Sequence, residues 1–223
     1  MIRAVFFDLD ETLVDAMACH LQASRQAFAH FGLDYDQACK LSSDYDSLGR
    51  RINEILEFRR NILGVNQATL PLEKLTTARE NIFLKCVSQK VKLLPGARQA
   101  VIHARKNSAI VAVTSSGTRK YINLCLKKFN LQQYIDFIVG EQDVNQGKPH
   151  PEIYNQAFSL IPKKLNIKKS QCLVIEDSIN GVKAAQAANF KVVFIPSKYS
   201  RGTIKADYQL SSLKQFNLTN FTT

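Results

Sequence analysis

The chain has 223 residues, 45% of them hydrophobic, which is enough for one sizeable core or for a core with a small inserted domain. The charged fraction of 22% is ordinary and argues against disorder, and no apolar run is long enough to span a bilayer. The formal net charge of +11 comes from basic residues dispersed along the chain. This pattern favours a solvated surface with some attraction for anions, so we expect no nucleic-acid or membrane partner.

The cysteines are widely spaced, without a Cys-x-x-Cys pair. Their odd number and wide spacing argue against a disulfide framework or a structural zinc site, and favour a reducing compartment. The short N-terminal apolar run is interrupted by Asp8 and Asp10, which is not typical of a secretory signal. We therefore expect a cytoplasmic protein, and we take a monomer or weak dimer as the working expectation.

The apolar residues Ile2 and 4–7 predict a buried strand over residues 2–7, and Asp8 and Asp10 follow it directly. Their spacing places both side chains on one side of the backbone, at the end of the strand where open α/β sheets bind ligands. Neighbouring carboxylates repel each other unless a cation joins them. The segment therefore predicts a metal-assisted site with one nucleophilic and one acid/base aspartate, although a strand ending in an Asp-rich turn would look the same.

The next part of the chain has helical patterns and no strand pattern. We expect helices over residues 17–31, 47–63 and 71–90, with a polar, broken stretch at 34–46. From residue 92 onward, apolar strand-like runs alternate with helical patterns. The predicted strands are 109–114, 135–139, 172–175, 191–195 and a short one at 207–210, and the predicted helices are 97–106, 118–129, 151–160 and 178–188.

This alternation predicts an α/β fold with a doubly wound, parallel, Rossmann-like sheet, to which the strand at residues 2–7 also belongs. We expect a catalytic core made of residues 1–15 and 92–223, and a helical cap domain inserted at residues 16–91.

Polar groups also follow the other predicted strands. Thr114, Ser115 and Ser116 end one strand and open a helix, where hydroxyl and N–H groups can bind an anion or simply cap the helix. Lys148, held between a glycine and a proline, could neutralise a phosphoryl group, or could be a solvated loop lysine.

Glu176 and Asp177 end a further strand, and carboxylate oxygens there suit Mg²⁺, a hard cation. The alternative is that this segment only caps the next helix, through Asp177 or Ser178. Polar groups of four kinds thus follow four strand ends in order, and this joint pattern indicates one site.

Together these motifs resemble those of the haloacid dehalogenase superfamily, in the branch that contains β-phosphoglucomutase and many sugar-phosphate and phosphoglycolate phosphatases. The matching segments are residues 8–12, 114–116, 147–152 and 176–178, with Gly181. They cover nearly the whole core, and the helical block after the first motif matches the cap of this branch. One position departs, because the residue after Asp10 is often glycine in this branch and is Glu11 here, which leaves the hinge geometry and subfamily open.

The resemblance implies that Asp8 attacks phosphorus and forms an aspartyl-phosphate. Asp10 would act as acid and then as base, and would lend its backbone carbonyl to Mg²⁺. Asp177 would complete the metal ligands contributed by the protein, with Glu176 behind them or bound through water.

On the substrate side, the resemblance implies that Thr114 and the amide of Ser115, with Ser116 beside them, hold the phosphoryl oxygens. Lys148 would offset the charge. In the cap, His20 could orient a substrate hydroxyl or lie on a partly exposed helix face. Arg50 could bind a substrate carboxylate or second phosphate, or pair with Glu54 on a solvated helix.

We therefore expect an Mg²⁺-dependent phosphatase acting on a small phosphorylated metabolite, such as a sugar phosphate or phosphoglycolate. A sugar-phosphate mutase of the β-phosphoglucomutase type is the alternative. A non-catalytic protein that binds a phosphate ligand or nucleic acid on the same scaffold is disfavoured by the complete set of motifs.

Overall fold

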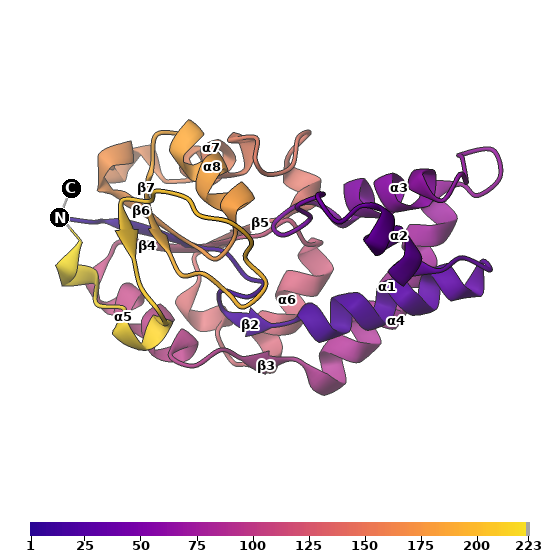
Figure 1. Cartoon of the computed structure of the whole chain (residues 1–223). Helices are drawn as coiled ribbons and strands as arrows, with labels where there is room; N and C mark the ends of the chain where they lie inside the picture. The colour runs from indigo at the N-terminus through magenta and orange to yellow at the C-terminus, as the bar shows by residue number, and fades with distance from the viewer. Residues whose placement is uncertain (222–223) are drawn as a thin grey trace.

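The computed structural model describes residues 1–221, in which helices α1 to α4 form one end of the molecule and a parallel sheet forms the other (Figure 1). Within these residues the sheet has six strands in the order β5-β4-β1-β6-β7-β8. Neighbouring strands are parallel throughout. The strands are β1 (Ala4–Phe7), β4 (Ile110–Thr114), β5 (Phe137–Val139), β6 (Cys172–Glu176), β7 (Lys191–Phe194) and β8 (Tyr208–Gln209). The predicted doubly wound α/β sheet is confirmed.

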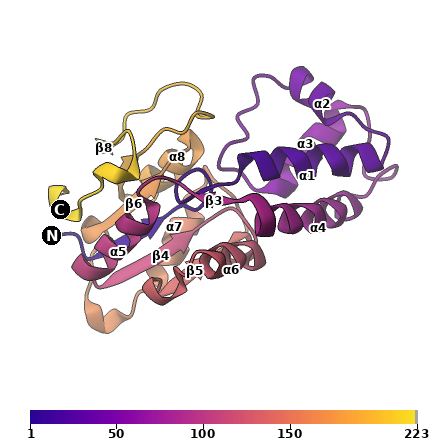
Figure 2. The same cartoon turned by 90° about the horizontal axis from the view of Figure 1, so that it is seen from below.

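Alternating side chains of each strand pack against helices on opposite faces of the sheet. Val5 and Phe7 belong to the hydrophobic core on one face, whereas Ala4 and Phe6 belong to the core on the other. Helices α5 and α6 cover the first face and α7 and α8 the second, as the two views show (Figures 1 and 2). Because both faces are covered, the central strands are continuous apolar runs. The helices are α5 (Ala97–Asn107), α6 (Arg119–Lys128), α7 (Glu152–Ser159) and α8 (Ile179–Ala187).

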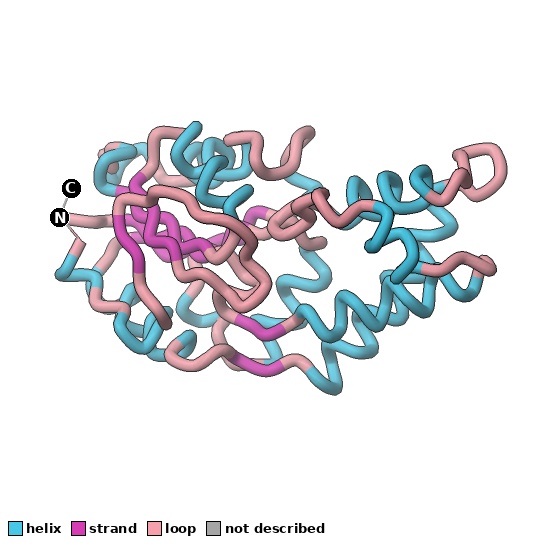
Figure 3. The backbone as a smooth tube through the Cα atoms, viewed as in Figure 1, coloured by secondary structure: helices cyan, strands magenta, loops and turns pink. Residues whose placement is uncertain are grey.

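The inserted helices have a separate hydrophobic core, which includes Phe28, Leu56 and Leu75. They are α1 (Met17–His30), α2 (Tyr35–Leu41), α3 (Ile52–Ile62) and α4 (Leu72–Lys90). We call these helices and their connecting loops the cap. The chain enters the cap through β2 (Val14–Asp15) and leaves it through β3 (Lys92–Leu93), which pair as an antiparallel ribbon between the two parts (Figure 3).

Two details of the predicted cap are wrong. The stretch at 34–46 contains α2, whose first amides, on Asp36 and Gln37, are capped by the side chain of Asp34. The helix expected over 47–63 begins only at Ile52, because the preceding residues form a loop that contacts the core. At the other end of the chain, short 3₁₀ segments follow β8 at Leu213–Gln215 and Leu218–Asn220.

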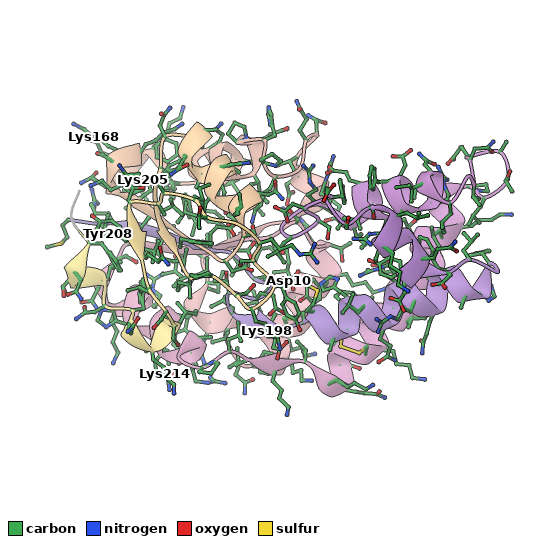
Figure 4. All side chains as sticks on the ribbon, viewed as in Figure 1. Asp10, Lys168, Lys198, Lys205, Tyr208 and Lys214 are labelled. Atoms are coloured by element: carbon green, nitrogen blue, oxygen red, sulfur yellow. A yellow bond between two sulfur atoms is a disulfide. The ribbon has the colours of Figure 1, made fainter. Side chains whose placement is uncertain are left out.

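The cysteine pattern was also misleading in one respect. A disulfide joins Cys19 of α1 to Cys86 of α4, visible as a yellow bond in Figure 4, so the expectation of no disulfide is wrong for this pair. The remaining cysteines, Cys39, Cys125 and Cys172, are free. The cytoplasmic location stays a prediction. Within residues 1–221, none of the helices combines the length and the apolar character needed to cross a membrane.

Candidate active site

The carboxyl ends of β1, β4 and β6 meet at one edge of the sheet. The register pairs Phe7 with Val113 and with Ile175, so the residues that follow on each strand become neighbours. Asp8 continues this pattern by donating its amide to the carbonyl of Ile175 over 2.9 Å. The parallel register therefore brings Asp8 beside Thr114 and Glu176, although these residues are far apart in the chain.

Lys148 lies at the centre of this edge with its ammonium group fully enclosed. Its Nζ is 2.5 Å from Asp8 Oδ1 and 2.6 Å from Glu176 Oε1. Only 1% of the residue is exposed, so the alternative of a solvated loop lysine is wrong. Burial alone would lower the pKa of Lys148, but the charges of Asp8 and Glu176 outweigh it and raise the pKa well above its usual value. Lys148 is therefore a fixed positive charge beside Asp8.

Glu176 uses both carboxylate oxygens to hold this arrangement. Oε1 accepts hydrogen bonds from Lys148 and from the hydroxyl of Tyr154, the latter at 2.5 Å. Oε2 accepts the amides of Asp177 and Ser178. A side chain at Gly181 would collide with this carboxylate, since a Cβ there would lie 1.9 Å from Glu176 Cδ. The glycine thus allows α8 to pass directly behind Glu176.

Asp177 is buried beside these groups, and its Oδ2 has no hydrogen-bond partner among the described residues. Burial raises the pKa of Asp177 well above its usual value, and the nearby charges of Asp8 and Glu176 raise it further. Asp8, Glu176 and Asp177 each offer an oxygen within 4.8 Å of the others. Of the two residues expected as possible caps of α8, Ser178 is the cap, since it accepts the amide of Gly181, and Asp177 is not. A buried, unpartnered carboxylate oxygen beside two further acids fits a hard divalent cation such as Mg²⁺.

The carboxylate of Asp10 lies outside this group of acids. The hydroxyl of Tyr121 donates to its Oδ1, and His20 Nε2 lies 3.3 Å from its Oδ2. Arg79 can only donate, and its Nη2 is 2.7 Å from His20 Nδ1, so we assign the imidazole proton to Nε2, which donates to Asp10. Burial acts to raise the pKa of Asp10, but the interaction with His20 and the hydrogen bond from Tyr121 outweigh it and lower the pKa. In Figure 4, Asp10 lies where the sheet meets the cap.

The motif after β4 is arranged differently from the expectation. The Ser115 amide, expected to hold a phosphoryl oxygen, donates to the carbonyl of Val139 over 3.0 Å and is not free. Thr114 is fully buried, with its hydroxyl 3.5 Å from the carbonyl of Phe7. Helix α6 is capped by Thr118, which rules out a capping role for the three preceding hydroxyl residues. Ser115 lines the cavity described below, and its hydroxyl accepts the amide of Gly117 over 3.1 Å.

The loop before α3 connects the cap to this edge. The hydroxyl of Ser116 donates to the carbonyl of Gly49 over 2.7 Å, and Asn180 Nδ2 donates to the carbonyl of Leu48 over 2.9 Å. Arg50 Nη1 lies 3.9 Å from the carboxylate of Glu54, which agrees with the alternative expectation that these two residues pair on α3. Residues 46–49 are therefore a docking loop between the cap and the core.

Glu11, at the position that is often glycine in this branch, holds the start of the first cap helix. Its backbone is left-handed, with φ of 56°, and its carboxylate accepts the amides of Ala16 and Met17 at 3.0 Å each. These amides open α1, whose own N-cap residue, Ala16, provides no side-chain acceptor. Burial raises the pKa of Glu11 to about 7. Glu11 thus caps the first cap helix from the core side.

A cavity of about 730 Å³ lies between the cap and this edge of the sheet. From the core it is lined by Asp8, Asp10 and Asp177, and from the cap by residues that include His20 and Arg50. Its volume is within the range of small-molecule sites. The predicted residues therefore surround one cavity, except that Thr114, Lys148 and Glu176 lie behind its wall.

Sequence reasoning missed several residues that complete the site. Tyr121 and Tyr154 gave no signal, because an aromatic residue at helical spacing is normally part of a core. Arg79 looked like an ordinary residue of a long helix. Asn180 could have been noticed, since a polar side chain in the first turn after Asp177 lies at the ligand-binding edge.

The sequence and the structure were compared with known proteins. The sequence profile of the haloacid dehalogenase-like hydrolases matches residues 5–195. Protein CbbY of Rhodobacter capsulatus is 29% identical over 220 residues, covering 95% of this chain and 94% of CbbY. Hexitol phosphatase B of Escherichia coli (strain K12) is 26% identical, covering 96% of this chain and 94% of its own.

Among solved structures, CbbY from Rhodobacter sphaeroides in complex with phosphate superposes with a TM-score of 0.81 at 24% identity, covering 98% of both chains. This likeness supports the fold. The profile match covers far more than half of the chain, so the predicted superfamily and the prediction of an enzyme are confirmed. The chain belongs to the family of haloacid dehalogenase-like hydrolases.

Proposed function

We propose that the protein is an Mg²⁺-dependent phosphatase that hydrolyses a small phosphorylated metabolite through an aspartyl-phosphate on Asp8. The observation that carries this proposal is the arrangement of Asp8, which borders the cavity beside the buried Lys148 ammonium and the unpartnered oxygen of Asp177. A nucleophile between a fixed positive charge and a cation site suits phosphoryl transfer, in which positioning and charge stabilisation provide most of the catalysis. The hydrolase family and the names of the relatives support the same reaction class.

In the first step, Asp8 attacks the phosphorus atom and the leaving oxygen departs with a proton. Lys148 offsets negative charge at Asp8 and cannot move, because Glu176 holds it from the other side. Mg²⁺, held by Asp8 and Asp177 with the backbone carbonyl of Asp10, would supply further positive charge to the phosphoryl oxygens. The hydroxyl of Ser115, on the cavity wall, is the group from this motif that we assign to phosphate binding.

Asp10 is the proposed acid in the first step and the base that activates water in the second. In this structure its carboxylate is held by Tyr121 and by His20 of the cap. It must therefore turn toward Asp8 before it can transfer a proton to the substrate. We propose that movement of the cap releases His20 from Asp10, which would couple closure over the substrate to proton transfer.

The substrate class follows from the cavity and from the relatives. A cavity of about 730 Å³ suits a metabolite of sugar-phosphate size. The relatives include a hexitol phosphatase, which supports a phosphorylated sugar or sugar alcohol.

Hydrolysis of p-nitrophenyl phosphate with and without Mg²⁺, followed by a panel of phosphorylated metabolites, tests the proposal. We expect turnover that requires Mg²⁺ and is lost in Asp8→Asn, which keeps the shape of the side chain but not its nucleophilicity. Absence of phosphate release from every ester, or full activity in Asp8→Asn, would contradict the proposal. Isomerisation of a sugar phosphate that is faster than phosphate release, and depends on a bisphosphate activator, would instead identify a mutase.

A further inference from the structure

The two oxygens of the Asp10 carboxylate are held by partners from different parts of the protein. Tyr121, which donates its hydroxyl to Oδ1, lies in α6 of the core. His20, whose Nε2 is 3.3 Å from Oδ2, lies in α1 of the cap. Movement of the cap therefore separates His20 from Asp10 but leaves Tyr121 in place, because Tyr121 and Asp10 both belong to the core.

Tyr121 is fixed near the start of α6 through its backbone and its ring. Its amide donates to the hydroxyl of Thr118, the N-cap residue, over 3.2 Å. Its ring uses space left by Gly117, where a Cβ would lie 2.7 Å from Tyr121 Cδ1. Only 1% of Tyr121 is exposed. The position of its hydroxyl is therefore set by the core before any substrate binds.

The ring of Tyr121 is also a surface against which the cap packs. Figure 2 shows α6 beside α4 of the cap. Phe83 of α4 packs against Tyr121 with ring centroids 4.8 Å apart, and the His20 imidazole lies edge-on to the same ring at 6.2 Å. These ring contacts can separate as the cap moves without loss of a hydrogen bond from the Tyr121 hydroxyl. The bond from Tyr121 to Asp10 thus does not depend on the position of the cap.

We propose that Tyr121 is the positioning residue of Asp10: its hydroxyl anchors Oδ1 to the core, while Oδ2 exchanges its contact with His20 for one with the substrate. The inference rests on the proposed function and deepens it, because it gives the two oxygens of Asp10 separate roles. Hydrogen bonds to an ionised carboxylate are among the stronger ones in proteins. The anchor therefore limits the turn of Asp10 to a pivot about Oδ1.

Both steps of the reaction then use Oδ2. In the first step, Oδ2 gives its proton to the leaving oxygen as the bond from that oxygen to phosphorus breaks and the bond from Asp8 to phosphorus forms. In the second step, Oδ2 takes a proton from the water that attacks the aspartyl-phosphate, and this proton serves the next cycle. An acid whose other oxygen is already fixed loses less freedom on reaching the transition state, so the anchor should increase the rate.

Tyr121→Phe tests the anchor, because it keeps the ring and removes only the hydroxyl. The quantity measured is kcat/KM with Mg²⁺ for phenyl phosphate, whose leaving oxygen needs a proton, and for p-nitrophenyl phosphate, whose leaving oxygen departs without one. This ratio reports the transfer to Asp8 relative to free enzyme and ester. We expect Tyr121→Phe to lower kcat/KM for phenyl phosphate by roughly 10-fold more than for p-nitrophenyl phosphate. General damage to the site would lower both values equally.

Tyr134→Phe is the matched control. Tyr134 packs against the same hydrophobic core and lies outside the group of described residues that line the cavity. Its substitution should leave kcat/KM unchanged for both esters. If Tyr121→Phe does not fold, as judged by circular dichroism, Gly117→Ala takes its place, since the added Cβ displaces the Tyr121 ring. We expect Gly117→Ala to show the same difference between the two esters.

Crystal structures of the wild type and of Tyr121→Phe test the anchor without turnover. We expect Asp10 Oδ1 to accept the Tyr121 hydroxyl in the wild type, and the Asp10 carboxylate to be displaced or divided between conformers in the variant. An Asp10 in the same place in both structures would overturn the inference, and so would equal losses for the two esters or a gain for phenyl phosphate. A wild type that hydrolyses no phosphate ester, but whose Asp10 moves in Tyr121→Phe, would contradict the proposed function alone.

Discussion

The edge of the sheet and the cap wall across the cavity differ in how their charges are compensated. At the sheet edge, Lys148 is paired with Asp8 and Glu176, and the group left over is an oxygen of Asp177. On the cap wall, Arg59 and Arg79 line the cavity together with Glu80, and Glu141 lines it from the core, so both signs of charge are present there. The sheet edge is therefore the side that is short of a cation, and a metal ion would satisfy it.

Removal of the central cation should disturb the sheet edge most. Lys148→Met would leave Asp8 and Glu176 buried without their partner, and we expect a loss of about 3–5 kcal/mol in the free energy of unfolding. The activity should fall with it. Lys168→Met, at an exposed site far from Asp10 in Figure 4, is the control and should change neither quantity. Chemical denaturation with both variants measures the difference, and equal stabilities would show that the buried pairing is unimportant.

The packing behind Glu176 provides the next test. Gly181→Ala would place a Cβ 1.9 Å from Glu176 Cδ, so either the carboxylate or α8 must move. We expect a loss of about 1–3 kcal/mol in stability, together with reduced phosphatase activity, since Glu176 positions Lys148. Ala187→Ser changes an exposed residue of the same helix and should behave like the wild type. Unchanged melting and activity in Gly181→Ala would mean that Glu176 does not need its observed position.

Asp177 should show the conflict between stability and metal binding. Its pKa is raised above the ordinary value of 3.8, so the folded, metal-free protein holds this proton more tightly than the unfolded chain does. The resulting loss of stability grows as pH rises above 3.8 and is absent below it. At neutral pH without metal, Asp177→Asn should therefore melt at a higher temperature than the wild type.

When Mg²⁺ is added, the melting temperature of the wild type should rise, whereas that of Asp177→Asn should change little. Scanning calorimetry in chelator and in Mg²⁺ measures both effects. Equal stabilisation of the two proteins by Mg²⁺ would place the cation elsewhere.

The smallest predicted effect lies at the hinge between the two regions. Glu11→Ala keeps the unfavourable left-handed backbone and loses the cap of α1, so we expect a loss of about 1 kcal/mol. Glu11→Gly also loses the cap but relieves the backbone, and should be more stable than Glu11→Ala by about 1 kcal/mol. Thermal melts of both variants in chelator give the ranking, and the reverse order would exclude the proposed hinge role.

The same contrast explains how far the sequence alone could predict the structure. The site acids could be located because each follows an apolar strand, and parallel strands place their carboxyl ends at one edge. Short-range patterns determine these features. The cap was less predictable, because the loop before α3 is held by Ser116 and Asn180 from distant parts of the core. A helical pattern at 47–51 carries no information about such contacts.

Other features depended on tertiary contacts that leave no local pattern. The β2–β3 ribbon pairs only two residues on each strand, across the whole cap. The disulfide joins cysteines separated by 67 positions. The side chain of Asp10 is held by Tyr121 and His20, and neither partner is predictable from residue type. Sequence therefore located the chemistry, but not the contacts that control it.

The most direct test of the account is to look for the phosphorylated enzyme. The wild-type protein is mixed with Mg²⁺ and a substrate identified in the metabolite screen, quenched in acid within one turnover, digested and analysed by mass spectrometry. The account predicts that the peptide containing Asp8 gains the mass of one phosphoryl group, and that Asp8→Asn shows neither the adduct nor turnover. Rapid turnover by an Asp8→Asn protein, or an adduct located on another residue, would contradict it.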